Sequence, residues 1–427
     1  MSKLDSYNGM VVSQHFSSIR DFISFEQVCK KFNGTMAKFH YNPIPLTLKT
    51  IEFFESLETL YIWQLTDENF GNDYMASKKQ RDNENMHYHI MQHPFKKLKK
   101  VCYPKMMKLK PSYWFPNASV AFFKIVVWHD VEYQVVVDNK DKNVVFKNVI
   151  LNKESKKYCH GTIPEEVTEI GEELFEYDSI TSIEIPKSVT KLHNSVFESC
   201  TNLTSVSFPD KLCIIGDSCF KKCNHLNEIV LPAHLFEIEG KNVFSECNIT
   251  SIVIPKFVTS IPSQCFFECK LLSKVTLHDS VECLCSFCFA GCDELCHIDL
   301  PDSITSIRAG AFKFCKKLKS VTLPSKIDVI RTVTFEGCVE LSEIKMSGQI
   351  NVMENYCFRD CLALKEFSIP NGVTKVGDGC FAGCSMLSKI DISSTVRTIG
   401  KQCFKGCGLL KIIPLPITVE SYGASTY

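Results

Sequence analysis

Eleven segments of the sequence end in an apolar residue at a constant spacing, and this spacing strongly constrains the fold. Each of these residues follows the previous one by 23 positions, and Pro comes next in eight of the eleven segments. A unit of this length buries its apolar face only against stacked copies of itself. The sequence therefore predicts a repeat solenoid. The eleven residues are Ile185, Phe208, Leu231, Ile254, Leu277, Leu300, Leu323, Met346, Ile369, Ile392 and Leu415.

The full unit reads L-x-x-V-x-Φ-P-x-x-V-x-x-I-x-x-x-C-F-x-x-C, where Φ is an apolar residue. Its first part alternates apolar and polar positions, which is typical of a strand with one buried face. Pro lacks an amide donor, so it is expected where the strand ladder ends. The V-x-x-I-x-x-x-C-F part returns the chain as a turn, a short strand or a single helical turn. The predicted fold class is thus a predominantly β solenoid with short helical or turn segments.

Two columns of cysteine accompany a column of phenylalanine. One Cys lies three residues after the Phe in ten copies, and another precedes the Phe in six. In the second column, Val196, Val243, Ala311 and Thr334 replace Cys in other copies. Exchange with small or apolar residues is typical of a packing position, and free Cys behaves as a small buried hydrophobe. We therefore predict that both columns lie in the core. The Phe column is Phe175, Phe197, Phe220, Phe244, Phe266, Phe289, Phe312, Phe335, Phe358, Phe381 and Phe404.

One group of cysteines departs from the columns. Cys283, Cys285 and Cys296 lie near the column members Cys288 and Cys292. Convergence of these thiolates would make a tetrahedral zinc site, but their spacing is not that of paired C-x-x-C knuckles. Core packing is the favoured alternative, so the sequence predicts no metal site and no cofactor.

The repeat resembles the BspA-type leucine-rich repeat, whose signature is I-P-x-x-V-x-x-I-G-x-x-A-F-x-x-C. The resemblance covers about residues 163–416, with Cys often in place of Ala. Including its N-terminal region, the chain is similar to the BspA-like repeat proteins expanded in parasitic protists. This resemblance implies a leucine-rich-repeat solenoid and a binding or adhesive role with an unspecified partner.

The N-terminal segment 1–45 has apolar spacings that suit short amphipathic helices. Its DFISFEQVCKKF stretch resembles the second half of an F-box, although the opening L-P-x-E is missing. The resemblance implies binding to a Skp-type adaptor of a ubiquitin ligase. The alternative is a helical cap that shields the first repeats from solvent. The residues that would contact the adaptor are Phe22, Ile23, Val28 and Phe32.

Four regions are expected along the chain. The helical segment 1–45 is followed by degenerate repeats and a β-rich cap over 46–150, the regular repeats over 151–416, and a C-terminal tail over 417–427. A polar loop at 67–94 carries His87, His89 and His93, which we expect to be exposed rather than metal-binding. A lysine-rich run from Lys96 to Lys110 is expected to be a solvated edge. If aromatic side chains anchor a partner, we expect them in the N-terminal region, at Tyr113, Trp114, Phe115 or Trp128.

Composition and motifs narrow the classes of function. Lys plus Arg and Asp plus Glu number 48 each, so the zero net charge does not favour binding to nucleic acid. The sequence has no apolar stretch long enough to span a membrane and no signal-peptide pattern at its start, which predicts a cytoplasmic protein. Phosphate-binding loops, G-x-S-x-G and H-E-x-x-H are absent. These observations predict a protein that binds other proteins and is not an enzyme.

Binding is expected on the exposed positions of the L-x-x-V-x-Φ strands, whose mixture of small hydroxyls and both charge signs fits a polar protein partner. The leading hypothesis is a protein–protein interaction scaffold. The alternatives are an F-box-like substrate-recognition subunit of a ubiquitin ligase and a cell-surface adhesin of the BspA-like type. The predicted binding residues are Ser205, Ser207, Glu228, Lys274, Thr276, His297, Asp299, Ser320, Thr322, Glu343, Lys345, Glu366, Ser368, Lys389 and Asp391.

Overall fold

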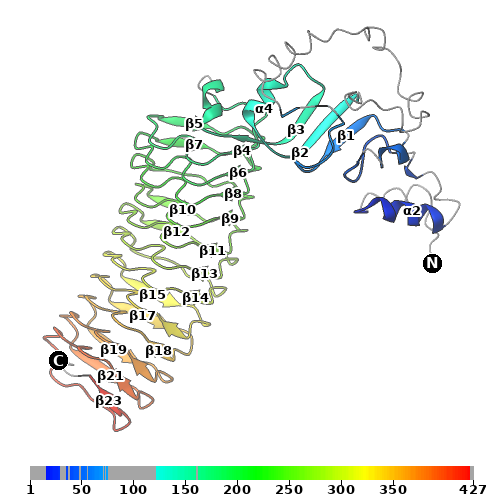
Figure 1. Ribbon diagram of the computed structural model, residues 1–427. Coiled ribbons are helices and arrows are strands. Elements are labelled where there is room, and N and C mark those ends of the chain that lie inside the picture. The colour runs from blue at the N-terminus through cyan, green and yellow to red at the C-terminus, as the bar shows by residue number, and fades with distance from the viewer. Residues whose placement is uncertain are drawn as a thin grey trace, which may run out of the picture. The chain divides into compact units, whose positions relative to one another are not determined.

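A computed structural model describes most of the chain, which divides into two compact units, residues 1–150 and 151–427 (Figure 1). Several predicted features lie outside the described residues: Phe32, the loop histidines, the lysine-rich run and Tyr113, Trp114 and Phe115. The described residues are 16–28, 35–36, 39–47, 50–54, 56–70, 72, 74–75, 122–159 and 162–423.

The first unit contains three parallel strands paired in the order β1-β2-β3. These strands lie almost entirely in the region 46–150, where a β-rich cap was expected. The helix α2 of this unit is amphipathic, as expected, and packs Phe22 into a core with Phe39 and Phe54. The elements are α2 (Ile19–Val28), η3 (Ile51–Phe53), β1 (Thr59–Ile62), β2 (Lys124–Glu132), α4 (Tyr133–Asp138) and β3 (Val144–Leu151).

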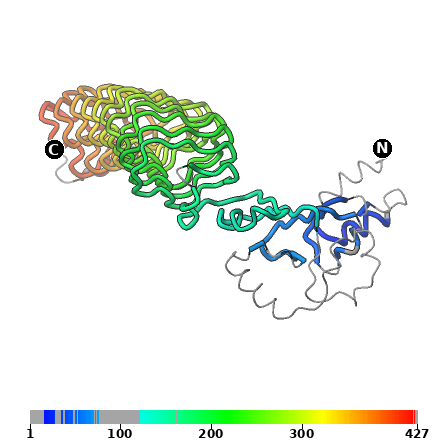
Figure 2. The backbone as a smooth tube through the Cα atoms, turned by 90° about the horizontal axis from the view of Figure 1, so that it is seen from above, coloured from blue at the N-terminus to red at the C-terminus, as the bar shows by residue number. Residues whose placement is uncertain are grey.

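The second unit is the predicted solenoid, in which successive turns stack in register (Figures 1 and 2). After η6 (Glu154–Tyr158), the V-x-x-I part of each turn forms a two-residue strand, and these strands make the short row. The short row pairs in three parallel groups: β4-β6-β8-β9, β11-β13-β14 and β16-β18-β20-β22-β23. Its strands are β4 (Glu169–Ile170), β6 (Lys191–Leu192), β8 (Ile214–Ile215), β9 (Glu237–Ile238), β11 (Ser260–Ile261), β13 (Cys283–Leu284), β14 (Ser306–Ile307), β16 (Val329–Ile330), β18 (Val352–Met353), β20 (Lys375–Val376), β22 (Thr398–Ile399) and β23 (Ser421–Tyr422).

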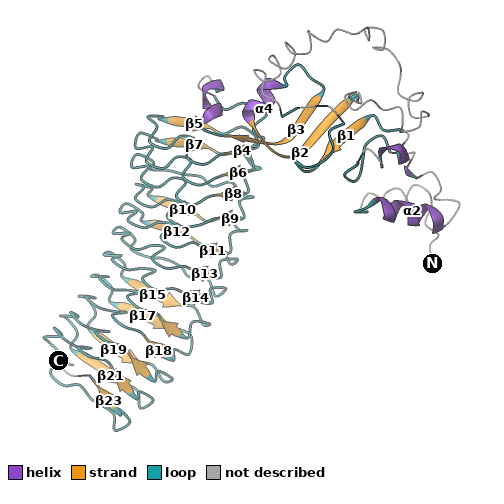
Figure 3. Cartoon of the chain, in the orientation of Figure 1, coloured by secondary structure: helices purple, strands orange, loops and turns teal. Residues whose placement is uncertain are grey.

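The L-x-x-V-x-Φ part of the turns forms a second series of strands, the face row (Figure 3). These strands pair two by two and do not form one long sheet: β5-β7, β10-β12, β15-β17 and β19-β21. The segments at 228–230 and 297–299 hold the same place in their turns without forming regular strands. The face row comprises β5 (Ser182–Glu184), β7 (Ser205–Ser207), β10 (Ser251–Val253), β12 (Lys274–Thr276), β15 (Ser320–Leu323), β17 (Glu343–Met346), β19 (Glu366–Ile369) and β21 (Lys389–Ile392).

The phenylalanine column forms a continuous stack through the interior of the solenoid, as predicted. Ten successive pairs from Phe175 to Phe404 have ring centroids 5.2–5.8 Å apart and interplanar angles of 2–17°. Nine of these rings, from Phe197 to Phe381, are fully buried. Each turn therefore completes the core of its neighbours, because one turn alone would leave its ring exposed on both faces.

One turn gains a residue before its phenylalanine and loses one after it, since Phe266 follows Phe244 by only 22 residues, and this does not interrupt the stack. Phe244 follows Phe220 by 24 residues, yet their rings are 5.5 Å apart with an interplanar angle of 9°. Gly240 lies in the enlarged corner with φ +71°, a left-handed conformation that glycine adopts without a Cβ penalty. The insertion is thus confined to the corner before Phe244.

Every turn of the stack also bends at two left-handed corners, two residues before and two residues after its phenylalanine. Most of these corners are occupied by residues other than glycine, and Val333, a β-branched residue, has φ 52°. An isolated residue in this region costs roughly 1–2 kcal/mol. The favourable stacking of neighbouring turns therefore outweighs a local backbone cost at each corner.

Candidate binding face

Strand alternation separates the face row into a buried and an exposed set of side chains. In β10, Ile252 is buried while Ser251 and Val253 point outward, since successive side chains of a strand alternate. Fourteen of the fifteen predicted binding residues are exposed, and Ser320 is half-buried. The structure thus brings the predicted residues onto one exposed surface of the repeat array.

In the later turns of this surface, many charged side chains form ion pairs with one another. Glu343 and Lys345 form an ion pair with N···O 3.4 Å, and Lys389 lies 3.6 Å from Asp391 and 3.9 Å from Glu366. In an earlier turn, His297 Nε2 is 2.9 Å from Asp299 Oδ1. The Ser368 hydroxyl donates a hydrogen bond to the carboxylate of Asp391. Exposed ion pairs of this kind contribute little to stability, but they reduce the number of free charges offered to a partner.

The earlier turns differ, and we name their exposed residues the free face. Among the described residues, no hydrogen bond or ion pair involves a side chain of this set. Glu228 and Lys274 are its two charged members, and small hydroxyls surround them. Its polar groups are therefore available to a partner. The free face comprises Ser205, Ser207, Glu228, Val230, Ser251, Val253, Lys274 and Thr276.

Val230 and Val253 form an apolar centre in the free face. This apolar centre was not predicted from the sequence. The two valines hold the same position in consecutive turns and are 84% and 62% exposed. We had considered only the polar members of the exposed columns. The signal was present in the sequence: both valines stand where other turns carry Ser207, Thr276 or Asp299.

Aromatic side chains lie at the corner that follows these valines. The rings of His234 and Phe257 stack at 6.2 Å with an interplanar angle of 17°, and Phe257 is 45% exposed. Lys256 Nζ lies 4.8 Å from the centroid of the Phe257 ring. Each of these residues is close in sequence to the valine of its own turn. The early turns thus present apolar and aromatic groups together, whereas the later turns present paired charges.

The cysteine columns are structural, as predicted. All members from Cys200 to Cys403 are fully buried, and Cys407 is 8% exposed. Each Cys that follows the Phe donates its S–H to the carbonyl oxygen of the Phe of the preceding turn, for example Cys315 to Phe289 at 3.1 Å and Cys338 to Phe312 at 3.1 Å. Burial raises the pKa of these thiols, to about 12 for Cys200. They therefore remain protonated donors rather than thiolate nucleophiles or ligands.

The five cysteines considered for zinc are dispersed. Cys288 and Cys292 are fully buried in the columns, and Cys296 is exposed on the part of its turn that precedes His297. Cys283 and Cys285 contact each other, with their Sγ atoms 3.8 Å apart. Across the described ranges, no three His, Cys, Asp or Glu side chains gather as a metal site would require.

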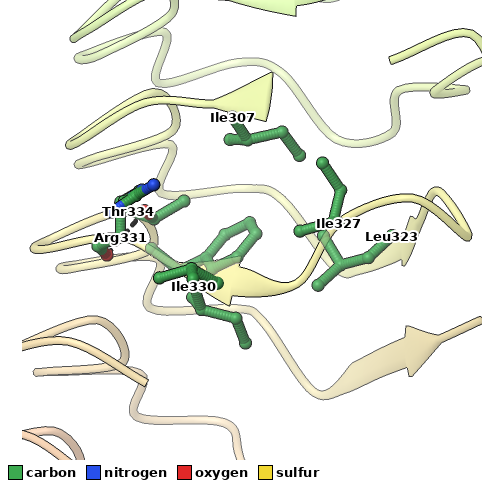
Figure 4. A pocket seen from close by; sticks show the side chains of 8 residues that line it. Ile307, Leu323, Ile327, Ile330, Arg331 and Thr334 are labelled. Atoms are coloured by element: carbon green, nitrogen blue, oxygen red, sulfur yellow. Dashed lines mark hydrogen bonds between the residues drawn. The ribbon is translucent and has the colours of Figure 1, made fainter. Parts of the chain in front are cut away.

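The interior of the solenoid leaves little space for a ligand. A cavity of about 10 Å³ lies between Ile307, Leu323, Ile330 and Phe335 (Figure 4). This volume admits at most one water molecule, and its lining is almost entirely apolar. Thr334 Oγ1 at its edge donates to the Arg331 carbonyl at 2.7 Å. This cavity is therefore too small for a ligand larger than water.

In the first unit, the adaptor hypothesis depends on side chains of α2. Phe22 is fully buried, with its ring 5.1 Å from Phe16 and 5.6 Å from Phe54, and Ile23 packs partly buried against the same core. Phe22 stabilises the unit itself and is not free to dock. Val28 ends the helix. This placement does not favour a Skp-type adaptor site.

Trp128, one of the expected aromatic anchors, belongs to a surface cluster of the first unit. Its ring stacks on Trp63 at 5.2 Å with an angle of 17°, and Tyr61 stacks on Tyr41 at 4.7 Å. Trp128 is 36% exposed, and Lys147 Nζ lies 5.7 Å from its ring centroid. Stacking thus covers one face of each of these rings.

Comparison with known proteins identifies the repeat. A family model described as a BspA type leucine rich repeat region of six copies matches residues 153–241, 237–365 and 351–427. No curated protein matches the sequence. In the part of the chain that is described, no helix combines the length and apolarity of a membrane span.

Several solved structures are similar to this chain. A leucine-rich repeat protein of Bacteroides ovatus is 25% identical, the match covering 58% of this chain and 85% of that one, with a TM-score of 0.35. A leucine rich cell surface protein of Faecalibacterium prausnitzii is 26% identical over 58% and 86%, with a TM-score of 0.40. A leucine-rich repeat protein of Eubacterium ventriosum is 19% identical over 66% and 82%, with a TM-score of 0.46. With the matched family region extending over most of the stacked turns described above, the chain belongs to the BspA-type leucine-rich repeat family.

Proposed function

We propose that this chain is a non-enzymatic protein-interaction scaffold that binds its partner through the free face. The observation that carries the proposal is the exposure of Val230 and Val253 at the centre of a surface whose polar side chains make no hydrogen bond or ion pair among the described residues. Leucine-rich repeat arrays generally present extended surfaces for binding proteins.

The composition of the free face fits a protein better than a sugar or a nucleic acid. Protein interfaces combine an apolar centre with a polar rim, and here Val230 and Val253 are surrounded by serine and threonine hydroxyls. Single-stranded nucleic acid is bound by basic grooves with aromatic platforms, whereas the free face carries one basic and one acidic residue. Desolvation of the two valines would favour binding, and Glu228 and Lys274 would select a partner of complementary charge.

Quantitative capture from the native cell tests the proposal. The full chain and a Val230→Glu/Val253→Glu variant are used as baits, and recovered proteins are compared by mass spectrometry. We expect recovery of the specific partner to fall at least about tenfold, because placing two carboxylates in the apolar centre would cost more than about 1.4 kcal/mol of binding free energy.

A matched control is available on another part of the array. Leu271 and Leu362 are 45% and 40% exposed and lie in the corners after the cysteine column. The Leu271→Glu/Leu362→Glu variant also adds two charges at exposed apolar positions, and it should retain the partner. Equal loss of the partner from both variants, or from neither, would reject the free face as the binding surface.

The other hypotheses make separate predictions. An F-box-like role requires recovery of a Skp-type adaptor that depends on residues 1–45, which the burial of Phe22 does not favour. An adhesin role requires surface exposure, so staining of intact cells with an antibody to the chain distinguishes it from the predicted cytoplasmic location.

A further inference from the structure

One turn of the short row carries two outward-facing thiols. Cys283 and Cys285 flank Leu284, which is fully buried, so both thiols lie on the outer side of β13. Their Sγ atoms are 3.8 Å apart, and both side chains are partly exposed. In the described turns of the solenoid, no other short-row strand combines two cysteines at these positions. The thiols of the two cysteine columns are buried, so a ligand in solvent cannot reach them.

The neighbours of this pair leave it accessible. Cys283 is aligned with Ser260 of β11 and with Ser306 of β14, two small side chains. The Ser260 hydroxyl lies 3.4 Å from Cys285 Sγ. Burial raises the pKa of Cys285, and the hydrogen bond with Ser260 and, to a smaller extent, the charge of Arg308 oppose this rise. The pair is thus a site of two soft sulfur atoms, with the Ser260 hydroxyl and the Arg308 guanidinium nearby. Both thiols are uncharged while they are protonated.

We propose that Cys283 and Cys285 form a two-thiolate site for a soft monovalent metal ion, of which copper(I) is the representative. Thiolates select copper(I) over hard ions such as magnesium and calcium. Zinc prefers four ligands in a tetrahedron, and no third His, Cys, Asp or Glu side chain among the described residues gathers with this pair. On binding, each thiol releases one proton, and the two sulfurs share the ion as Cu(SR)₂⁻. No change of oxidation state is involved.

The site is tested by copper(I) competition under anaerobic, reducing conditions. The full chain is titrated against a chromophoric copper(I) chelator at less than one equivalent of metal. We expect the wild-type chain to take most of this copper(I) from the chelator. Cys283→Ser and Cys285→Ser should each weaken binding by more than about a hundredfold, since losing an outer-shell partner alone costs 10–100-fold. Cys283→Ser introduces the residue that both neighbouring turns carry, so the fold should be retained.

Control variants and a second readout make the outcome decisive. Cys213 and Cys296 are also accessible, and their Ser variants should bind copper as the wild type does. Copper should also protect Cys283 and Cys285, and neither control, from alkylation detected by mass spectrometry. Failure of the wild type to compete, or equal binding by a Cys283→Ser/Cys285→Ser chain, would overturn the proposal. It stands independently of the protein-binding function.

Discussion

Gly310→Ala probes how the left-handed corners couple one turn to the next. Gly310 has φ +64°, and a Cβ atom there would overlap the ring of Phe287 in the preceding turn. The same arrangement recurs where the ring of Phe314 covers Gly337 and that of Tyr356 covers Gly379. At these three corners an aromatic residue is thus followed, one turn later, by a glycine that makes room for its ring, whereas Tyr177 is followed by Ser199.

The expected cost has three parts. Alanine in the left-handed region costs about 1.5 kcal/mol, and displacement of the Phe287 ring from its rotamer costs about 1 kcal/mol. Reduced freedom of the unfolded chain offsets about 0.7 kcal/mol. The net loss in the free energy of unfolding is therefore about 2 kcal/mol. For the solenoid, a loss of about 2 kcal/mol corresponds to a decrease of about 4–8 °C in melting temperature.

Gly408→Ala provides the control, because a Cβ there meets no atom within 4 Å and the backbone is not left-handed. It should leave the melting temperature unchanged or raise it slightly. Thermal unfolding followed by circular dichroism measures both variants. Hydrogen exchange of residues 285–335 localises the effect, since a repeat array need not unfold in two states.

A double-mutant cycle isolates the contact with the ring. In a Phe287→Ala background, Gly310→Ala should cost only about 0.8 kcal/mol, which leaves a coupling of about 1 kcal/mol between the two positions. The reasoning would be refuted if Gly310→Ala and Gly408→Ala had the same effect, or if Gly310→Ala cost as much without the ring as with it.

Three other substitutions test the account of stability. Phe289→Ala removes a fully buried ring from the stack and should destabilise the chain by about 3–5 kcal/mol, measured by denaturant unfolding; a cost below about 1 kcal/mol would contradict the stacked core. Val333→Gly relieves a β-branched residue at φ 52° and should not lower, and is expected to raise, the melting temperature. Glu354 is partly buried, which opposes ionisation, but hydrogen bonds from Thr332 and Arg331 outweigh burial and hold its pKa below the ordinary 4.5. Its contribution to stability is therefore present above pH 4.5 and lost as the pH falls through the lower folded-state pKa, so Glu354→Gln should flatten the acid limb of a stability–pH profile; an unchanged limb would exclude this role.

The sequence was most informative where a periodic apolar residue has a single environment. The phenylalanine column and its cysteines could be predicted as core because the same side chains recur at one position and every turn repeats the contacts of the last. The strands of the face row could be predicted because apolar and polar residues alternate along them, which is typical of a strand with one buried side.

Other features depend on contacts that a periodic pattern does not specify. Corner residues as different as Val333 and Gly310 share one backbone conformation because stacking imposes it, so residue type gave no signal. The pairing of Phe287 with Gly310 appears only when consecutive turns are superimposed. The segment expected as a C-terminal tail contains β23, which pairs with β22 and extends the short row. Its sequence lacks the Cys-Phe element by which the other turns were recognised.

Site-specific photocrosslinking tests the proposed binding surface most directly. A photoreactive amino acid is placed at Val253 in the free face, and at Leu271, which is similarly apolar but lies in a corner of the array. We predict that irradiation of cells joins one discrete partner to the chain labelled at Val253 and not to the chain labelled at Leu271. Capture of the partner from Leu271 and not from Val253 would contradict binding through the free face.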